Sequence, residues 1–385
     1  MAKANRSATS YRDRIIGRLS GRAPGPTLVV VGSIHGNEPA GAEALEAVVG
    51  RLSREGLLER GDFLAVVGNV EALDLGARYI DEDLNRHWNR DALDRLRTAE
   101  SLERSEERER KELFEELVKG FASARGEIVL LDLHTLSGEG KPFAVFADTL
   151  RSRHFARRFP VPAILGLEEN LDGTLADYVA LLGHAAVAFE GGQHHDPAVV
   201  ANLAAVVWVA LGELAMVDRG RAGIEGERTR LRRATGGVPG ILEVTYRHAI
   251  DQKDGFQMRP GFRSFERVVT GQVIADDATG RVAVPSDGFL LMPLYQKLGN
   301  DGFFVAQRVR AFWLVLSAVL RYLRAGRIAH WLPGVSRIEG EPHALAVNRR
   351  VARWSSLPIL HLLGFRRWSE AGDRLVVERR AHDLP

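Results

Sequence analysis

The sequence lacks cysteine altogether over its length of 385 residues. This absence excludes disulfides, thiolate zinc sites and a cysteine nucleophile. Any metal ion must therefore be held by His, Asp or Glu.

A hydrophobic run of membrane-spanning length is also missing. The most apolar late stretch, residues 311–323 (AFWLVLSAVLRYL), contains an arginine and is shorter than the roughly 20 apolar residues that a membrane span needs. The basic N-terminus has no apolar run before Thr27, so it does not have the pattern of a secretory signal. We therefore expect no transmembrane segment and a cytoplasmic location, and we interpret residues 311–323 as a buried helix.

A strong excess of one charge is absent as well. The formal net charge is +2, and Lys and Arg are scattered rather than gathered into a patch that could follow a phosphate backbone. Nucleic acid is therefore not an expected partner. With 45% hydrophobic and 26% charged residues, the composition is that of an ordinary globular protein of two or three domains.

Continuous apolar runs indicate buried strands with helical patterns between them. Residues 28–31, 63–67 and 128–133 are runs of this kind, and they predict an α/β sheet that is covered on both faces. The densely charged stretch 91–124 has leucines at helical spacing, which predicts one or two amphipathic helices. Residues 198–216 predict another helix.

The composition changes near Arg219. Residues from about 236 to 309 are rich in Gly with short Val, Ile and Phe segments, which predicts a smaller β-rich domain. We expect three regions: a first domain at 1–218, a β-rich C-terminal domain at 219–309, and a helix with an Arg/Trp-rich tail at 310–385. The tail could lie on an anionic membrane surface or a partner. We favour packing against its own domain, with Arg stems covering apolar surface.

Two potential metal ligands lie together in one glycine-containing loop. In SIHGNEPAG, His35 and Glu38 are three residues apart and follow the strand predicted at 28–31, at the strand end where ligands commonly collect. Imidazole and carboxylate both suit zinc, and a catalytic zinc has three protein ligands and an open position for water. Because a short H-x-x-E pair also arises by chance, a third ligand is required.

His134 is the candidate for that third ligand. It ends the run IVLLDLH, so it projects from a second buried strand, a rigid element suited to a metal site. Asp132 lies two residues earlier, which places both side chains on one face of the strand. Asp132 could then orient the imidazole of His134 through a hydrogen bond.

A second block, RYIDEDLNR, follows the strand predicted at 63–67 and contains Arg78, Asn85 and Arg86. Arginine holds carboxylates through two parallel hydrogen bonds and can face a developing oxyanion. The alternative is that both arginines merely pair at the surface with the acidic residues that lie between them.

A third block, VAFEGGQHH, contains Glu190 at the end of another short apolar run. A glutamate at a strand end opposite a metal could act as a general base on the metal-bound water. His194 and His195 follow closely, but adjacent residues on an extended chain point to opposite sides. We leave both histidines out of the metal site.

Taken together and in order, GSIHGNEPAG, RYIDEDLNR, LLDLHT and FEGG resemble the succinylglutamate desuccinylase/aspartoacylase family, a branch of the zinc carboxypeptidase-like superfamily. The family pattern is H-x-x-E, N-R, D-L-H and a late Glu, and it runs over most of the first 215 residues. The resemblance implies an α/β fold, a mixed sheet flanked by helices and followed by a smaller β-rich domain.

Carried over residue by residue, the resemblance implies one zinc ion per chain, bound by His35, Glu38 and His134. Glu190 would activate the water, and Arg78 would polarise the scissile carbonyl.

The resemblance also assigns residues to the substrate. Asn85 and Arg86 would hold its carboxylate, and Tyr295 is a candidate counterpart of a C-terminal-domain tyrosine that reaches the site in aspartoacylases. One position departs from the family: aspartoacylases carry an arginine shortly before the catalytic glutamate, where this sequence has Ala180. That arginine reads the substrate's side-chain carboxylate, so N-acetylaspartate is not the expected substrate.

We therefore predict that residues 1–218 form a zinc-dependent amidohydrolase, a deacylase that acts on carbon–nitrogen bonds other than peptide bonds. The expected substrate is a small N-acyl amino acid, or a similar amide or ester with a free carboxylate, cleaved by glutamate-activated zinc-bound water. A zinc carboxypeptidase that trims peptides is an alternative, because Asn85 and Arg86 would serve it equally well. A non-catalytic binding protein on the same scaffold would have no use for a general base. The sequence is compatible with a homo-oligomer but does not define the oligomeric state.

Overall fold

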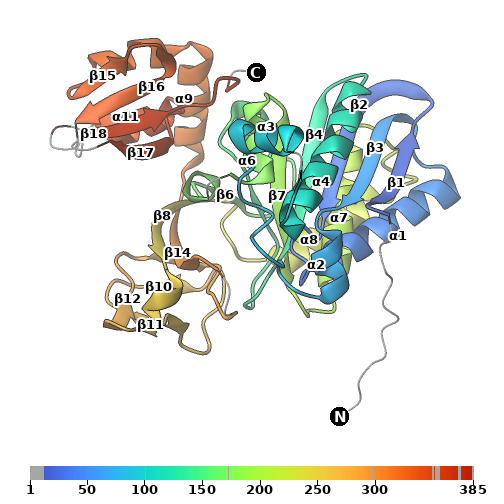
Figure 1. Ribbon diagram of the computed structural model, residues 1–385, viewed down its shortest axis with the longest axis horizontal. Coiled ribbons are helices and arrows are strands. Elements are labelled where there is room, and N and C mark those ends of the chain that lie inside the picture. Colours follow the sequence, from blue (N-terminus) through green and yellow to red (C-terminus); the bar gives the residue numbers. More distant parts are fainter. Residues whose placement is uncertain are drawn as a thin grey trace. The chain divides into compact units, whose positions relative to one another are not determined.

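The structure is a computed structural model that describes residues 13–99, 101–171, 173–296, 299–348, 351, 356–371 and 374–383. The chain forms two compact units, whose elements are labelled in Figure 1. Unit 1 comprises Met1–Thr135 and Phe189–Arg230, and unit 2 comprises Leu136–Ala188 and Leu231–Pro385. The three-region division with boundaries at 218 and 309 stays a prediction.

The sheet of unit 1 has a parallel centre and an antiparallel edge. β2 (Ala23–Gly32) is parallel to β3 (Arg60–Val67) and to β4 (Ile128–Leu136), while β1 (Ile15–Ser20) runs antiparallel to β3. The strand order is β1-β3-β2-β4. The three apolar runs predicted as buried strands lie in β2, β3 and β4 and are confirmed, because their residues are buried on both faces of the sheet.

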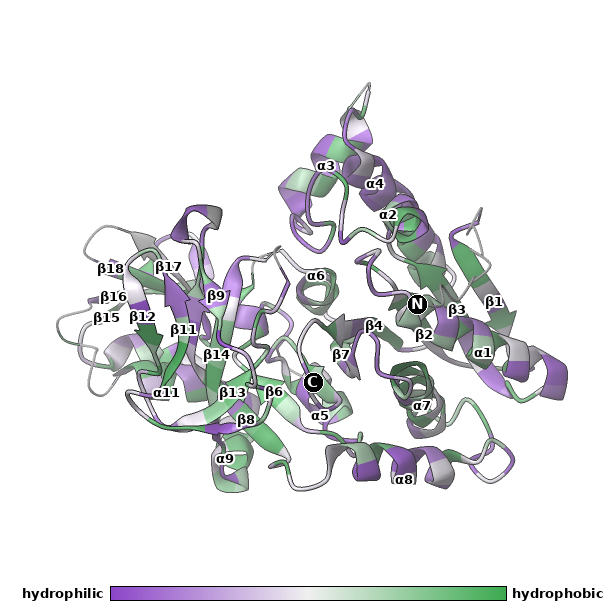
Figure 2. Ribbon diagram, turned by 90° about the horizontal axis from the view of Figure 1, so that it is seen from below, coloured by the Kyte–Doolittle hydropathy of each residue, from purple (hydrophilic) through white to green (hydrophobic). Residues whose placement is uncertain are grey.

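Helices cover both faces of this sheet (Figure 2). α1 (Ala40–Glu55) and α7 (Val199–Glu213) pack together on one face, and α2 (Val70–Leu75), α3 (Arg90–Thr98) and α4 (Ser105–Ala122) lie on the other. The helices predicted within 91–124 and 198–216 are therefore confirmed as α3, α4 and α7.

Unit 2 contains mixed-sheet strands in the order β5-β6-β8-β14-β13-β10, and two smaller antiparallel sheets. β5, β6 and β8 are parallel, and β8, β14, β13 and β10 are antiparallel. β7 (Ala185–Gln193) begins in unit 2 and ends in unit 1. The strands of the mixed sheet are β5 (Phe143–Val145), β6 (Ala163–Leu165), β8 (Ile241–Ala249), β10 (Arg267–Val268), β13 (Gly288–Leu291) and β14 (Asp301–Arg308).

The smaller sheets have the orders β12-β11-β9 and β15-β16-β18-β17. The first contains β9 (Gln257–Met258), β11 (Val273–Asp277) and β12 (Gly280–Ala283), and the second contains β15 (Val335–Ile338), β16 (Glu341–Asn348), β17 (Arg367–Ala371) and β18 (Arg374–Glu378). The remaining helical elements are α5 (Leu150–Ala156), α6 (Leu175–Leu181), α8 (Ile224–Thr235), α9 (Ala311–Tyr322), α11 (Ser356–Leu362) and the short 3-10 helices η1 (Glu168–Asn170), η2 (Gln252–Asp254) and η3 (Ala325–Trp331). The predicted fold class, a mixed sheet flanked by helices with a further β-rich region, is confirmed.

The described part of the tail folds against unit 2. Its four-stranded sheet and α11 enclose an apolar cluster that includes Val347, Leu360 and Phe365. Buried arginines then join the tail to the earlier part of the unit: Arg321 pairs with Asp148 at 2.6 Å. The packing favoured from the sequence is therefore found, but it rests on buried ion pairs more than on arginine stems over apolar surface.

The interpretation of 311–323 as a buried helix is half wrong. The helix exists as α9, but Phe312, Val315 and Tyr322 are 64%, 57% and 71% exposed. Only the opposite side, with Leu314 and Ser317, faces the unit. Within the described part of the chain, no helix is long and apolar enough to cross a membrane.

Candidate metal centre

The loop between β2 and α1 carries the first two candidate ligands, His35 and Glu38. Ser33 opens this loop with a left-handed backbone, φ 56°, and its hydroxyl donates to the Glu38 carbonyl at 2.8 Å. Gly36 is packed so tightly that a Cβ on it would lie 2.1 Å from the backbone of α2. These contacts fix the loop above the end of β2.

The third candidate ligand, His134, comes from the neighbouring strand. Because β2 and β4 are adjacent and parallel, and Gly32 pairs with Leu133, His134 lies level with the start of the loop. The carboxyl ends of two parallel strands thus bring together residues that are about a hundred positions apart in the sequence, which is the usual location of ligand sites in such sheets.

The three side chains converge. One donor atom from each of His35, Glu38 and His134 lies within 4.8 Å of the others, and all three residues are buried. Nδ1 of His35 is 2.9 Å from Glu38 Oε1, and Nδ1 of His134 is 3.5 Å from Glu38 Oε2. The set predicted from sequence therefore forms one cluster.

Each histidine is held on its far side by a carboxylate. Nε2 of His134 is 2.9 Å from Asp132 Oδ2, and Nε2 of His35 is 3.1 Å from Asp83 Oδ1. Carboxylates in this position orient metal-binding imidazoles and set their tautomer. Asp132 therefore lies where the sequence predicted. Asp83 was missed, since the sequence suggested for it only a surface pair with arginine.

The carboxylates of the cluster are ionised in this arrangement. Burial alone would raise the pKa of Glu38, but the positive charges and hydrogen bonds of His35 and His134 hold that pKa well below its usual range. Burial would also raise the pKa of Asp83, but His35 and Arg78 hold that pKa well below its usual range. The backbone N–H of Thr135 also donates to Glu38 Oε2 at 2.8 Å.

Arg78 lies inside the cluster. Its Nη2 is 2.9 Å from His35 Nε2 and 3.1 Å from Asp83 Oδ2, and its Nη1 is 3.5 Å from Glu38 Oε1. The alternative of pairing with a nearby acidic residue is thus partly correct, because Arg78 does pair with Asp83. The pair is largely buried, however, with the Arg78 side chain only 15% exposed.

Asn85 and Arg86 follow on the same segment but face different partners. The Asn85 amide nitrogen is 3.5 Å from Asp132 Oδ2 and 3.5 Å from His134 Nε2, so it lies beside the candidate ligands. The Arg86 guanidinium donates to the Asn85 carbonyl at 2.7 Å.

Glu190, on the part of β7 that belongs to unit 1, is buried in the field of this cluster. Burial is the main reason that the pKa of Glu190 is raised to about 8, and the Glu38 and Asp132 charges add to it while His134 and Arg78 oppose it. Its Oε2 atom has no hydrogen-bond partner among the described residues. A buried carboxyl group with a free oxygen and a pKa near neutrality is suited to take up and release a proton.

The donor set and its charge fit a divalent cation. Two imidazoles and a carboxylate match the ligands that zinc takes in catalytic sites. Glu38, Asp83 and Glu190 place three acidic groups around Arg78. A bound cation would offset the repulsion among these buried carboxylates.

Three other residues singled out from the sequence are not members of the three-residue ligand group. The Tyr295 hydroxyl, in unit 2, lies within hydrogen-bond distance of two backbone carbonyls, 2.8 Å from that of Phe262 and 3.0 Å from that of Arg259, and its single proton can be donated to either. Its role toward substrate stays a prediction. Ala180 is fully buried in α6 of unit 2. His194 is in unit 1, with Nδ1 2.6 Å from the Thr135 hydroxyl, and is not part of the metal-ligand group.

Unit 1 is thus an α/β protein with a candidate metal centre at the carboxyl ends of parallel strands. Residues 24–206 match the family described as succinylglutamate desuccinylase/aspartoacylase catalytic domain. Over these residues the chain matches this family, as its motifs predicted.

Individual relatives agree with this assignment. A succinylglutamate desuccinylase of Pseudomonas syringae pv. tomato is 40% identical over 68 residues, which are 18% of this chain and 20% of that protein. The chain therefore matches about a fifth of the length of this curated relative.

Solved structures extend the likeness of the fold. The succinylglutamate desuccinylase of Chromobacterium violaceum superposes with a TM-score of 0.52 at 19% identity, covering 76% of this chain and 88% of that one. Murine aminoacylase 3 superposes with a TM-score of 0.51 at 19% identity, covering 75% and 97%. At this level of identity the comparisons establish the fold alone.

Proposed function

We propose that the chain is a zinc-dependent hydrolase that cleaves an N-acyl amino acid, or a similar amide or ester with a free carboxylate. The observation that carries this proposal is the buried cluster of His35, Glu38 and His134, with Glu190 buried nearby and one of its oxygens unpaired. The family that residues 24–206 match supports it.

His35, Glu38 and His134 would hold the zinc ion, with Asp83 and Asp132 orienting the two imidazoles. When bound, zinc lowers the pKa of water and polarises a carbonyl group. The carboxylates on the far side of each histidine keep Nδ1 directed to the centre of the cluster.

Glu190 would take a proton from the attacking water while the oxygen of that water forms its bond to the carbonyl carbon. As the carbon–nitrogen bond breaks, Glu190 would return that proton to the leaving amine. A pKa of about 8 suits both transfers. Arg78 would donate to the oxyanion that forms on the carbonyl oxygen, for which it must turn from its present partners.

Asn85 and Arg86 would hold the substrate's carboxylate, the amide by a hydrogen bond and the guanidinium by charge. Because Ala180 replaces the arginine that reads an acidic side chain in aspartoacylases, we propose a substrate without that second carboxylate. A carboxypeptidase would use the same residues, so a substrate panel must contain both N-acyl amino acids and peptides. A cytoplasmic location and a homo-oligomer also stay predictions.

The test is a hydrolysis screen with the wild type and with Glu190→Gln. General acid–base catalysis contributes about 10²–10⁴-fold, so the variant should lose about that factor in kcat while it retains its metal. Glu46→Gln, which removes the same charge from an exposed position on α1, is the matched control and should hydrolyse at the wild-type rate. Wild-type turnover by Glu190→Gln would contradict the proposal.

A further inference from the structure

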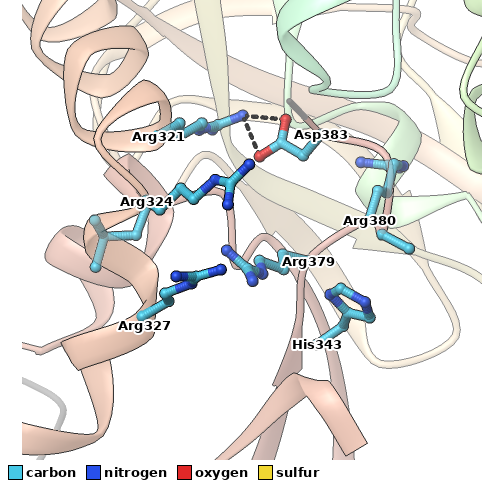
Figure 3. A pocket seen from close by; sticks show the side chains of 9 residues that line it. Arg321, Arg324, Arg327, His343, Arg379, Arg380 and Asp383 are labelled. Atoms are coloured by element: carbon cyan, nitrogen blue, oxygen red, sulfur yellow. Dashed lines mark hydrogen bonds and ion pairs between the residues drawn. The ribbon is translucent and has the colours of Figure 1, made fainter. Parts of the chain in front are cut away.

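A cavity of about 190 Å³ in the tail region of unit 2 is lined mainly by basic side chains. Five arginines and His343 face it against a single carboxylate, Asp383. Figure 3 shows the guanidinium groups of Arg324, Arg327 and Arg379 directed toward one another in this cavity. A negatively charged ligand between these groups would offset their mutual repulsion.

Two of the five arginines are already paired. Arg321 lies 2.6 Å from Asp148 and 3.1 Å from Asp383, and Arg380 lies 2.5 Å from Asp177. These ion pairs are buried and form the wall of the cavity. Asp383, the only acidic residue that lines the cavity, is therefore already paired with Arg321.

The other three arginines have no such partner. Among the residues that the structure describes, no carboxylate forms an ion pair with Arg324, Arg327 or Arg379. The Nε atom of Arg379 and Nδ1 of His343 are buried without a hydrogen-bond partner there. Burial lowers the pKa of Arg379, and the charge of Arg327 adds to this effect.

The backbone presents these groups at a local energetic cost. Arg324 has φ 56° and ψ 30° at the junction of α9 and η3, a left-handed conformation that is unfavourable for a non-glycine residue. Three positions on, Arg327 lies within η3. Across the cavity, the N–H of Arg379, just after β18, donates to the His343 carbonyl on β16 at 3.0 Å. Strain of this kind is often kept where the side chain has a task.

We propose that this cavity binds a phosphate-type oxyanion, held by Arg324, Arg327 and Arg379. Three guanidinium groups without a carboxylate partner among the described residues, two from the start of η3 and one from the end of β18, converge in the cavity. This arrangement matches a tetrahedral dianion better than a planar carboxylate that one arginine can satisfy. The volume equals that of about six water molecules at roughly 30 Å³ each, so a phosphate group and a few atoms of its carrier fit. The phosphate could be free, part of a small metabolite, or a lipid headgroup.

Calorimetric titration of the full chain with inorganic phosphate, at constant ionic strength in chloride, tests this. Wild type should bind phosphate saturably. Arg324→Gln/Arg327→Gln should bind it at least about tenfold more weakly, because charge-assisted hydrogen bonds contribute about 1.5–3 kcal/mol each and 1.4 kcal/mol is a factor of ten. Both side chains are exposed and form no ion pair with the residues that the structure describes, so the variant should fold and unfold at the wild-type temperature in chloride.

The matched control is Arg308→Gln/Arg310→Gln, which removes the same charge from exposed positions outside the cavity and should bind phosphate like the wild type. A second arm distinguishes the source of the phosphate. It uses co-sedimentation with phosphatidylcholine vesicles with or without phosphatidylglycerol, since the exposed apolar side of α9 lies on the same segment.

Phosphate binding that is lost in the cavity variant supports a soluble ligand. Cavity-dependent pelleting with anionic vesicles alone supports a headgroup. Binding of neither probe, or equal binding by the cavity variant and the wild type, would overturn the proposal. Hydrolytic activity is not a readout, so the result is independent of the proposed function.

Discussion

Glu168 is a buried carboxyl group that should make the protein less stable as the pH rises. It is 4% exposed, and burial, assisted by the charges of Asp177 and Glu169, raises the pKa of Glu168 from 4.5 to about 7. Only the Thr174 hydroxyl donates to its Oε2, at 2.6 Å, and with Arg380 it opposes the shift without cancelling it.

The sign and size of the effect follow from these two pKa values. Between about pH 4.5 and 7 the folded chain binds the Glu168 proton and the unfolded chain does not, so the free energy of unfolding falls as the pH rises. The contribution of the protonated Glu168 to the free energy of unfolding is complete below about pH 4.5 and is lost as the pH rises through about 7. A pKa difference of 7 − 4.5, about 2.5, corresponds to about 3 kcal/mol at 1.36 kcal/mol per pKa unit.

The assay compares unfolding free energies of wild type and Glu168→Gln at pH 5 and pH 8. The amide of the variant can still accept from Thr174 but cannot titrate, so the variant should gain about 2–3 kcal/mol relative to wild type over this interval. Glu341→Gln, an exposed control on β16, should follow the wild type. If Glu168→Gln shows the pH dependence of the wild type, the inferred burial of a neutral carboxyl group is wrong.

Three further predictions concern single residues. Asp132→Asn should weaken zinc binding about 10–100-fold in a chelator competition, because a carboxylate that orients a metal-binding histidine typically contributes this much. Asp148→Asn should lower the free energy of unfolding by about 3–5 kcal/mol, since it removes the charge partner at 2.7 Å from the buried Arg153 and the nearer of two carboxylates, at 2.6 Å, from the buried Arg321. Gly36→Ala should displace the ligand loop and reduce the bound zinc, because the added Cβ would lie 2.1 Å from the backbone of α2.

Each of these changes has a control. Asp62→Asn breaks a partly exposed pair with Arg125 and should cost at most about 1 kcal/mol, so a similar cost for Asp148→Asn would refute the buried network. Gly226→Ala adds a Cβ with nothing within 4 Å and should leave the zinc content unchanged. Wild-type zinc affinity in Asp132→Asn, or wild-type zinc content in Gly36→Ala, would refute the roles given to those residues.

The candidate ligands could be predicted because each lies where a buried strand ends. His35 and Glu38 follow the apolar run of β2, and His134 ends that of β4. The adjacency of β2 and β4 brings the residues together, and it can be inferred only from the family pattern or observed in the fold. Asp83 shows the limit, since its contact with His35 spans 48 positions and no local pattern marks it.

The C-terminal region was the least predictable. The apolar pattern of 311–323 predicts a helix correctly but does not tell which side is covered, because that depends on partners distant in sequence. The sequence around the arginines of the tail does not distinguish one of them from another. Arg321 and Arg380 nevertheless enter buried ion pairs, whereas Arg324 and Arg327 line a cavity without one.

The central claim is that His35, Glu38 and His134 hold a catalytic zinc ion. Its most direct test is elemental analysis of the purified full chain beside the double variant His35→Ala/His134→Ala, with circular dichroism to verify that both are folded. We expect close to one zinc ion per wild-type chain and almost none in the variant. A wild-type protein that neither purifies with zinc nor takes it up, or a folded variant that retains it, would contradict the account.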